Sequence, residues 1–379
     1  MNSNLDDIEM SGIRRFFNKV KDVDGAISLT LGQPDFKTPM EIKYGMIKAI
    51  EEDKTIYTDN FGLLELRKEI SRYLKSKKIN FEYDEICITV GASEALFSSI
   101  VAVVNKGDKV LVPTPAYPAY ENIVKIIGGK VVNYNLNDDF SLNIDKLERV
   151  IKEDKIKYMI LSYPSNPTGA VLNKDEYVKL VEIIRENNIN IISDEIYEAF
   201  CYDKYYSVAM SEDIKDNVIY IGGFSKMFSI TGIRIGFIAA KKAIINEIGK
   251  VHQYNVSCSN SIGQYGVLEG LKYGLYNINN MKEEFIKRKA YVEERLRNMN
   301  IDFVSPKGAF YIFPSIKKFN MNSELLCEKL LYEEKVACVP GNAFGVSGEG
   351  YIRISYCYSI DELSEGLNRI ENFTRKYSE

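Results

Sequence analysis

The sequence predicts an α/β protein, in which helices cover a mostly parallel sheet and a smaller α+β region follows. The first observation is an alternation of short β-branched segments with longer amphipathic ones through the middle of the 379-residue chain. The second is that the strand-like segments are apolar throughout, as strands covered on both faces are. The third is a change after about residue 280 to a long charged helix followed by short strands. A chain of this length usually forms two domains.

Strand and helix signals alternate in the order of βαβ units. Those of the sheet region are Ile86–Val90, Ser93–Val104, Lys109–Val112, Tyr117–Ile127, Tyr158–Tyr163, Lys174–Asn187, Ile189–Ser193, Val218–Ile221 and Ile235–Ala239. Those of the later region are the helix Met281–Met299, the strand Gly308–Phe313, the helix Glu324–Glu334 and the strand Gly350–Tyr356. Ligands of open α/β sheets bind beyond the carboxyl ends of the strands, so the residues directly after each strand are the candidates for a functional site.

The composition argues against several classes of function. The 49 Lys and Arg residues against 53 Asp and Glu residues give a net charge of −4, which provides no basic surface for nucleic acid or a membrane. A single histidine, His252, argues against His-based triads and most zinc sites, so we expect no metal. The six cysteines form no CxxC pair, and neither a membrane span nor a secretory leader is evident. We therefore expect a cytoplasmic protein that acts on small molecules.

Two segments that follow the first strands suit a flat, anionic ligand. Gly91, Ala92 and Ser93 form a small-residue turn that opens a helix, where free backbone N–H groups and the helix dipole attract a phosphate. Tyr117 follows the next strand between prolines, in a rigid segment that can present an aromatic face. Taken alone, the first segment is also typical of an ordinary capped helix, and the second of a tyrosine packed in the core.

Polar residues at the ends of the later strands suit catalysis. Asn166 lies in a sharp loop between two prolines, which either holds its amide for a ligand or lets it bond its own backbone. Asp194 ends a hydrophobic strand, where a buried carboxylate needs a cation or a donor, unless it caps a helix. Lys226 follows a glycine-rich strand end, and Arg234 comes eight positions later; the pair suits an imine-forming amine beside a phosphate clamp. Because a lone lysine is ordinarily solvated, only the combination makes these residues candidates.

In their order and spacing these motifs resemble the class I and II aminotransferases, which are fold-type-I pyridoxal-phosphate enzymes. The resemblance runs from Ser11 to Ser355 and so covers nearly the whole chain. It implies a seven-stranded, mostly parallel sheet in a large cofactor-binding domain at residues 46–280, and a small domain built from residues 1–45 and 281–379. It also implies an enzyme that transfers the α-amino group of an amino acid to a 2-oxo acid, usually 2-oxoglutarate, by a ping-pong mechanism.

The resemblance also implies a role for each candidate residue. Lys226 attaches the cofactor covalently and then moves a proton at the substrate Cα, while Asp194 keeps the cofactor's ring nitrogen protonated. Asn166 and Tyr197 contact the phenolic oxygen, and Tyr117 stacks on the ring. The implied catalytic residues are thus Lys226, Asp194 and Tyr197. The implied phosphate ligands are Ala92, Ser93, Ser225, Arg234 and, reaching in from a second subunit of a homodimer, Tyr57. The implied substrate ligands are Arg353, which grips the α-carboxylate, Gly32 and Asn166.

The sequence departs from the family pattern at two positions. Gly223 stands where many relatives have a hydroxyl that binds the phosphate, and Ile233 stands where a tryptophan is common. Both departures concern the shape of the pocket and not its chemistry. Within the family, the sequence is similar to the bacterial N-acetyl-LL-diaminopimelate aminotransferases. The donor nevertheless stays open between N-acetyl-LL-diaminopimelate, aspartate and aromatic amino acids.

Two other functions fit the same scaffold. A pyridoxal-phosphate-dependent β-lyase acting on sulfur amino acids needs the same lysine, because a fold does not fix a reaction. A cofactor-sensing regulator would need an added DNA-binding domain, for which the family-like region, starting near Ser11, leaves no room. For the aminotransferase, we expect Ile13, Phe16 and Phe17 to cover the substrate and Tyr311 to contact its side chain.

Overall fold

The centre of the fold is a seven-stranded sheet, seen in the computed structural model of the chain, which describes residues 3–6, 8 and 10–377. The strands lie in the order β2-β8-β7-β6-β5-β3-β4, and all of them are parallel to one another except β8. They are β2 (Ile86–Thr89), β3 (Lys109–Thr114), β4 (Lys130–Asn135), β5 (Tyr158–Ser162), β6 (Asn190–Asp194), β7 (Val218–Gly223) and β8 (Gly236–Ala239). The mostly parallel sheet predicted from the sequence is therefore confirmed.

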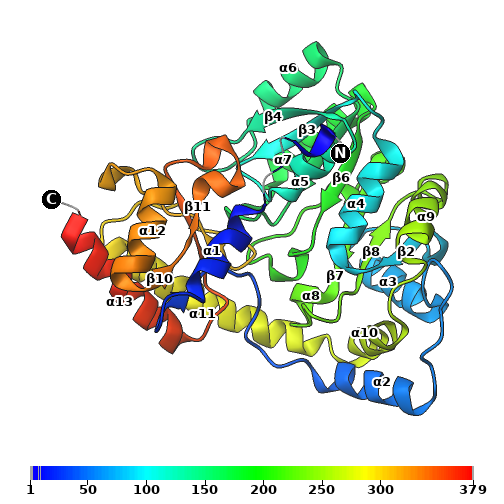
Figure 1. The fold of residues 1–379 in the computed structure, drawn as a ribbon. Coiled ribbons are helices and arrows are strands. Elements are labelled where there is room, and N and C mark those ends of the chain that lie inside the picture. Colours follow the sequence, from blue (N-terminus) through cyan, green and yellow to red (C-terminus); the bar gives the residue numbers. More distant parts are fainter. Residues whose placement is uncertain (1–2, 7, 9, 378–379) are drawn as a thin grey trace.

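Helices cover both faces of this sheet (Figure 1). On one face lie α4 (Gly91–Val103), α5 (Ala119–Ile126) and α9 (Lys242–Val256), and on the other lie α3 (Leu64–Ser76), α6 (Ile144–Asp154), α7 (Lys174–Asn187) and α10 (Ser261–Tyr273). Neighbouring residues of a strand point to opposite faces, so Met159 packs in one of the two core clusters and Ile160 in the other. Burial on both faces is the reason that the strands are apolar throughout.

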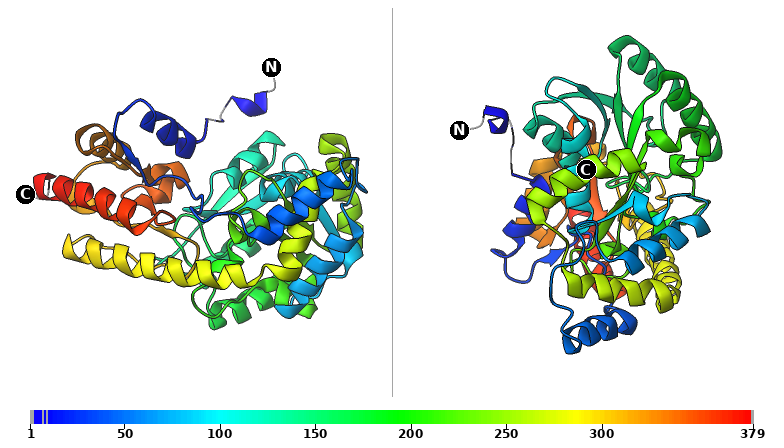
Figure 2. Two further views of the ribbon diagram at one scale, coloured as in Figure 1. Left: turned by 90° about the horizontal axis from the view of Figure 1, so that it is seen from below. Right: turned by 90° about the vertical axis from the view of Figure 1, so that its right-hand side faces the viewer.

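The two ends of the chain meet in a second, smaller region. Its centre is a three-stranded antiparallel sheet, β11-β12-β9, and a parallel pair, β1-β10. Its elements are β1 (Ile27–Ser28), β9 (Tyr311–Ile312), β10 (Val336–Ala337), β11 (Val339–Pro340), β12 (Ile352–Ser355), α1 (Gly12–Val20), α12 (Ser323–Glu334) and α13 (Ile360–Tyr377). Figure 2 shows α1, in blue, beside the orange and red C-terminal elements, so segments from opposite ends of the chain build this region together.

Two helices lie where the two parts of the fold meet. The long helix α11 (Tyr276–Asn298) runs beneath both parts (Figure 2), and α2 (Met40–Glu51) packs on α10. The domain boundaries expected after residues 45 and 280 fall inside these two helices. The strand expected at Gly308–Phe313 is paired only over β9, because Gly308 instead donates to the carbonyl of Gly169 and bridges to Cys201.

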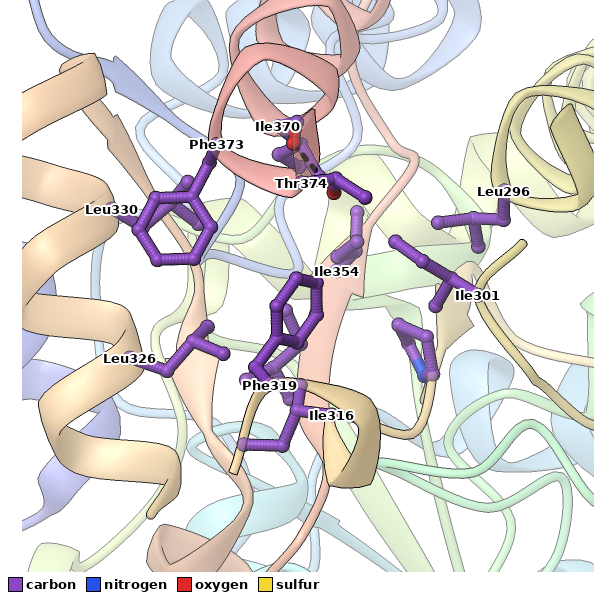
Figure 3. A pocket seen from close by; sticks show the side chains of 12 residues that line it. Leu296, Ile301, Ile316, Phe319, Leu326, Leu330, Ile354, Ile370, Phe373 and Thr374 are labelled. Atoms are coloured by element: carbon purple, nitrogen blue, oxygen red, sulfur yellow. Dashed lines mark hydrogen bonds between the residues drawn. The ribbon is translucent and has the colours of Figure 1, made fainter. Parts of the chain in front are cut away.

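The interior of the smaller region is closely packed. An apolar hollow of about 10 Å³ lies between α12, α13 and β12, where side chains such as Leu330, Ile354 and Phe373 surround it (Figure 3). A hollow of this size holds at most one water molecule, so it is too small for a ligand. Within the described residues, no helix is long and apolar enough to cross a membrane, and no group of three His, Cys, Asp or Glu side chains could hold a metal ion.

Candidate active site

The carboxyl ends of the parallel strands open into a cavity of about 510 Å³, which residues of both parts of the fold line. The turns after β2, β3, β5, β6 and β7 meet there because parallel strands end at the same edge of a sheet. Eleven of the twelve residues singled out from the sequence line this cavity: Gly32, Ala92, Ser93, Tyr117, Asn166, Asp194, Tyr197, Ser225, Lys226, Arg234 and Arg353. The exception is Tyr57, whose side chain lies outside this cavity and is 85% exposed.

Lys226 lies on α8 (Phe224–Met227), a short helix that directly follows β7. Its amine donates a hydrogen bond to the backbone carbonyl of Gly32. Burial is the main reason that the pKa of Lys226 is lowered to about 8, and the positive charges of Arg234 and Arg353 act in the same direction. At neutral pH the amine is therefore much closer to its neutral, nucleophilic form than an ordinary lysine is.

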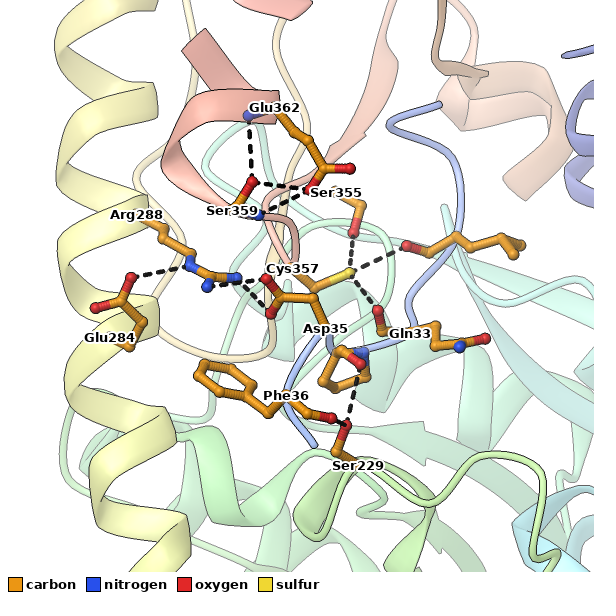
Figure 4. A network of polar contacts seen from close by, with 12 residues as sticks. Gln33, Asp35, Phe36, Ser229, Glu284, Arg288, Ser355, Cys357, Ser359 and Glu362 are labelled. Atoms are coloured by element: carbon orange, nitrogen blue, oxygen red, sulfur yellow. Dashed lines mark hydrogen bonds and ion pairs between the residues drawn. The ribbon is translucent and has the colours of Figure 1, made fainter. Parts of the chain in front are cut away.

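A network of polar contacts holds the segment that carries Gly32 (Figure 4). The carboxylate of Asp35 accepts hydrogen bonds from both terminal nitrogens of Arg288 on α11, at 2.8 and 3.1 Å. The hydroxyl of Ser229, just beyond α8, donates to the carbonyl of Phe36 at 2.7 Å. Bidentate pairing of this kind fixes geometry as well as adding energy. The network thus positions the carbonyl of Gly32 opposite the lysine.

Asp194 ends β6 with its carboxylate buried among neutral donors. It accepts hydrogen bonds from the hydroxyl of Tyr120 at 2.8 Å and from the backbone N–H of Ile196 at 3.2 Å. Burial raises the pKa of Asp194 to about 6, although both hydrogen bonds oppose the rise. No Lys or Arg side chain of the described residues pairs with it, so the protein itself does not supply the cation that the sequence led us to expect. The protonated ring nitrogen of pyridoxal phosphate is a cation that would fit there.

Tyr120 is a contact of the site that the sequence did not single out. Its hydroxyl also shares a hydrogen bond of 2.9 Å with the hydroxyl of Ser162, and its ring meets the ring of Tyr117 edge to face, with the centroids 5.7 Å apart. The one signal in the sequence is its place three residues after Tyr117, at the start of a helix. Both tyrosines line the cavity, and the edge-to-face contact with Tyr120 supports the ring of Tyr117.

Arg353 is buried, with 2% of its surface exposed, and so is not the solvated charge that an edge-strand arginine usually is. It donates to the side-chain oxygen of Asn166 at 2.7 Å and to the backbone carbonyl of Thr30. Its guanidinium carbon lies 4.3 Å from the centre of the Tyr311 ring. Its Nε is buried without a hydrogen-bond partner among the described residues. A buried cation with an unused donor fits an anionic ligand such as a carboxylate.

Tyr197 and Tyr311 lie together at the wall of the cavity. Their hydroxyl groups share a hydrogen bond of 2.8 Å. Burial raises the pKa of Tyr197 well above its usual value and that of Tyr311 to about 12, so both hydroxyls stay neutral near pH 7. The position of Tyr311 also explains Gly32, because a Cβ at Gly32 would lie 1.6 Å from the Tyr311 hydroxyl.

Arg234 and the first turn of α4 form the part of the cavity that fits a phosphate. Arg234 donates to the hydroxyl of Ser225 at 3.3 Å and to the carbonyl of Thr231 at 2.9 Å, and it forms no ion pair with any described carboxylate. Its guanidinium requires a glycine at position 91, because a Cβ there would lie 2.5 Å from Nη2. Ser93 lines the cavity from the first turn of the helix, where free N–H groups favour an anion.

The two departures from the family pattern have structural explanations. A Cβ at Gly223 would lie 2.6 Å from the side chain of Ile196, so this side chain fills the space that a hydroxyl-bearing residue would need. Ile233 packs against the start of α10, where a Cβ at Gly263 would lie 2.8 Å from it. Apolar packing therefore replaces a polar contact at Gly223.

The N-terminal helix α1 contributes to the cavity differently from the sequence prediction. Ile13 lines the cavity, as expected. Phe16 is completely buried in the hydrophobic core, and Phe17 is not among the lining residues, so the expectation that these two rings cover a substrate is wrong. Phe16 turns inward because the apolar side of an amphipathic helix packs on the core, whereas Phe17 is half-buried. Arg14, for which the sequence predicts no role, lines the cavity instead.

Known proteins of similar sequence and structure are aminotransferases. A family model described as aminotransferase class I and II matches residues 24–370. The chain is 44% identical to a probable N-acetyl-LL-diaminopimelate aminotransferase of Bacillus subtilis, over 100% of this chain and 97% of that protein. It is 40% identical to an aspartate aminotransferase of Pyrococcus abyssi, over 99% and 98%. An aromatic aminotransferase from Pyrococcus horikoshii superposes with a TM-score of 0.90 at 38% identity, over 95% of this chain and 99% of the other.

Proposed function

Because this chain belongs to the class I and II aminotransferases, we propose how its own residues carry out the reaction of that family. The chain is a pyridoxal-phosphate-dependent enzyme that transfers an amino group from an amino acid to a 2-oxo acid. One observation carries the assignment of roles: a lysine with a lowered pKa, Lys226, lies in one cavity with a buried carboxylate, Asp194, and a buried arginine, Arg353. The β-lyase alternative gains no support from the relatives described above.

Each of these three residues meets a separate chemical need. Bound pyridoxal phosphate supplies a ring that withdraws electrons from the substrate Cα. The amine of Lys226 holds the cofactor in place and later takes up and returns the Cα proton, for which a pKa near 8 is well suited. Asp194 keeps the ring nitrogen protonated, and Arg353 holds the α-carboxylate through two parallel N–H groups, which orients the Cα–H bond toward the lysine.

The remaining lining residues hold and tune the cofactor. Asn166 already accepts a hydrogen bond from Arg353 through its side-chain oxygen, which leaves its NH₂ group to donate to the phenolic oxygen of the cofactor. Tyr197 donates to the same oxygen, and Tyr117 stacks on the ring. The phosphate ligands in this proposal are Arg234, Ser225, Ser93 and the backbone N–H of Ala92.

We propose that the amino donor is N-acetyl-LL-diaminopimelate, aspartate or an aromatic amino acid, with 2-oxoglutarate as acceptor. The names of the relatives support each of these donors, and they differ among themselves. The test is a panel of donors at saturating 2-oxoglutarate, with glutamate production as the readout. We expect one donor class to exceed the others in kcat/KM. A β-lyase would instead release pyruvate and ammonia from a sulfur amino acid in the absence of any 2-oxo acid.

We further propose a homodimer in which Tyr57 completes the active site of the other subunit. Met40, Tyr44 and Ile47 recur at helical spacing on α2 and are each between 55% and 68% exposed, beside the exposed Ile56. Exposed apolar side chains in this number are typical of a surface that another subunit covers. Tyr57 itself lies outside the cavity of its own chain.

Mixing two inactive variants tests this arrangement. Lys226→Ala and Tyr57→Ala proteins are unfolded together and refolded, so that mixed dimers form. If the site is shared, a mixed dimer contains one site with both native residues, and activity rises above the sum of the separate variants. Activity equal to that sum, or a monomer in sedimentation, would refute the proposal.

We also propose a division into domains and a location in the cell. The chain divides into a large domain at residues 46–280 and a small domain at residues 1–45 and 281–379, with α11 continuing across the boundary. The protein is cytoplasmic, a proposal supported by its six free cysteines, since oxidising compartments favour disulfides. Limited proteolysis and the location of a fluorescent fusion test these two proposals.

A further inference from the structure

The residues that line the active-site cavity carry more positive charge than their proposed roles require. Among the described residues, four cationic side chains line it, Arg14, Lys226, Arg234 and Arg353, against a single carboxylate, Asp194. In the proposed function, Arg234 meets the phosphate, Arg353 meets the substrate α-carboxylate, Lys226 binds the cofactor, and Asp194 meets the ring nitrogen. Every charge then has a partner except that of Arg14.

Arg14 is held at the cavity by the helix on which it lies. The neighbouring Ile13 is 8% exposed and Phe16 is completely buried, so these two residues anchor α1 on the core. Arg14 itself is exposed, and it forms no hydrogen bond or ion pair with any described residue. Its positive charge reaches the middle of the site, since it helps burial to lower the pKa of Lys226 and opposes the rise that burial causes in the pKa of Tyr117.

The next residue, Arg15, shows how an arginine of the same helix behaves outside the site. It pairs with Glu324 at 2.8 Å and does not line the active-site cavity. The two adjacent arginines therefore differ in their partners as well: Arg15 has a carboxylate partner within the protein, and Arg14 has none among the described residues. Arginine presents a rigid fork of donors that matches a carboxylate, so the partner that suits Arg14 is a carboxylate of the ligand.

We propose that Arg14 binds a second carboxylate, at the far end of the substrate side chain, so that the preferred substrates are dicarboxylic amino acids and 2-oxo acids. This inference rests on the proposed function, because the first carboxylate is the one assigned to Arg353. It favours aspartate and N-acetyl-LL-diaminopimelate over aromatic donors, and it gives 2-oxoglutarate a specific ligand for its distal carboxylate. Arg14 is thereby a specificity-determining residue on the N-terminal helix.

Glutamate and glutamine form a matched pair of probes, since they have the same shape and differ in the charge of the side-chain end. The half-reaction of the cofactor-loaded enzyme with each amino acid, followed by absorbance, gives kcat/KM without an acceptor. We expect wild type to prefer glutamate. A hydrogen-bonded charge contact of this kind corresponds to roughly 10- to 150-fold, so Arg14→Ala should lower the glutamate-to-glutamine ratio by about that factor. Arg14→Lys should retain part of the preference.

Arg15→Ala is the matched control, because it removes an arginine from the same helix and should leave the ratio unchanged. Calorimetric binding of glutarate and pentanoate to the loaded enzyme gives a second readout that needs no turnover, and Arg14→Ala should weaken glutarate alone. Equal losses for both amino acids, or no loss, would overturn the role of Arg14 while leaving the aminotransferase intact. Failure of the wild-type enzyme to react with any amino acid would overturn the proposed function itself.

Discussion

The substitution Asp194→Asn should have opposite effects on the cofactor-free protein and on the loaded enzyme. In the cofactor-free protein the carboxylate is buried without a cation, and its pKa is raised from 3.8 to about 6. At 1.36 kcal/mol for each pH unit, this corresponds to about 3 kcal/mol of destabilisation when the group is charged. Asparagine keeps the size and the acceptor oxygen but carries no charge. The cofactor-free Asp194→Asn protein should therefore be more stable than wild type at pH 7.5.

The sign of the pH dependence follows from the two pKa values. Below pH 3.8 the carboxyl is protonated in the folded and unfolded states alike, so it has no effect on stability. Between pH 3.8 and 6 the folded state binds more protons than the unfolded state, and the stability of wild type falls as the pH rises. Above pH 6 the full destabilisation of about 3 kcal/mol is present. The advantage of Asp194→Asn should thus grow from near zero at pH 4 to its maximum above pH 6.

Urea unfolding of the cofactor-free proteins at pH 4.5, 6 and 7.5 measures this difference. Asp203, whose side chain is 59% exposed, provides a matched control: Asp203→Asn should change the free energy of unfolding by less than about 0.5 kcal/mol at any pH. In the loaded enzyme the carboxylate becomes favourable, because the ring nitrogen then supplies the missing cation. The affinity of Asp194→Asn for pyridoxal phosphate should be roughly 10- to 150-fold weaker. If Asp194→Asn lowered the free energy of unfolding of the cofactor-free protein by the same amount at all three pH values, the reasoning would be refuted.

Three further changes test other parts of the site. Since the pKa of Lys226 is about 8, the rate at which the cofactor-free protein binds pyridoxal phosphate should level off above about pH 8. This rate is followed by absorbance, and a rate that rises steadily to pH 10 would indicate an ordinary lysine. Gly223→Ser should destabilise the protein by about 1–3 kcal/mol because of contact with Ile196, and Ile196→Val should recover part of this in chemical denaturation. A harmless Gly223→Ser would contradict the packing argument. Asp35→Asn should lower the free energy of unfolding by roughly 2–3 kcal/mol, because it removes the charge that pairs with buried Arg288. An unchanged urea midpoint would show that other contacts hold the segment that carries Gly32.

Much of the site could be predicted because its residues follow strands. Ser93, Asn166 and Lys226 follow β2, β5 and β7, Asp194 is the last residue of β6, and parallel strands bring such strand ends to one edge of the sheet. Knowing the strands was therefore enough to expect these side chains together. Arg353 could be linked to them only through the family resemblance, because it lies on β12 in the other part of the fold.

Residues on helices were harder to assign. Nothing in the sequence distinguishes Arg14 from Arg15, yet one lines the cavity and the other pairs with Glu324. Phe16 was expected over the substrate and is buried in the core. Neighbouring residues of a helix point about 100° apart, so a small change in how the helix packs decides which of them faces the site.

The sequence by itself determined the sheet, the family and the chemical identity of the cofactor site, because these depend on the order and type of residues along the chain. Only the tertiary structure decided that, among the described residues, Asp194 meets neutral donors and no cation and Arg353 is buried with an unused donor, and that Lys226 has a pKa of about 8. Each of these depends on burial and on distances between groups far apart in the chain, which set the local dielectric and the strength of every charge interaction. The same reason makes Arg14, one arginine among many in the sequence, a cation that lines the cavity without a hydrogen bond or ion pair among the described residues.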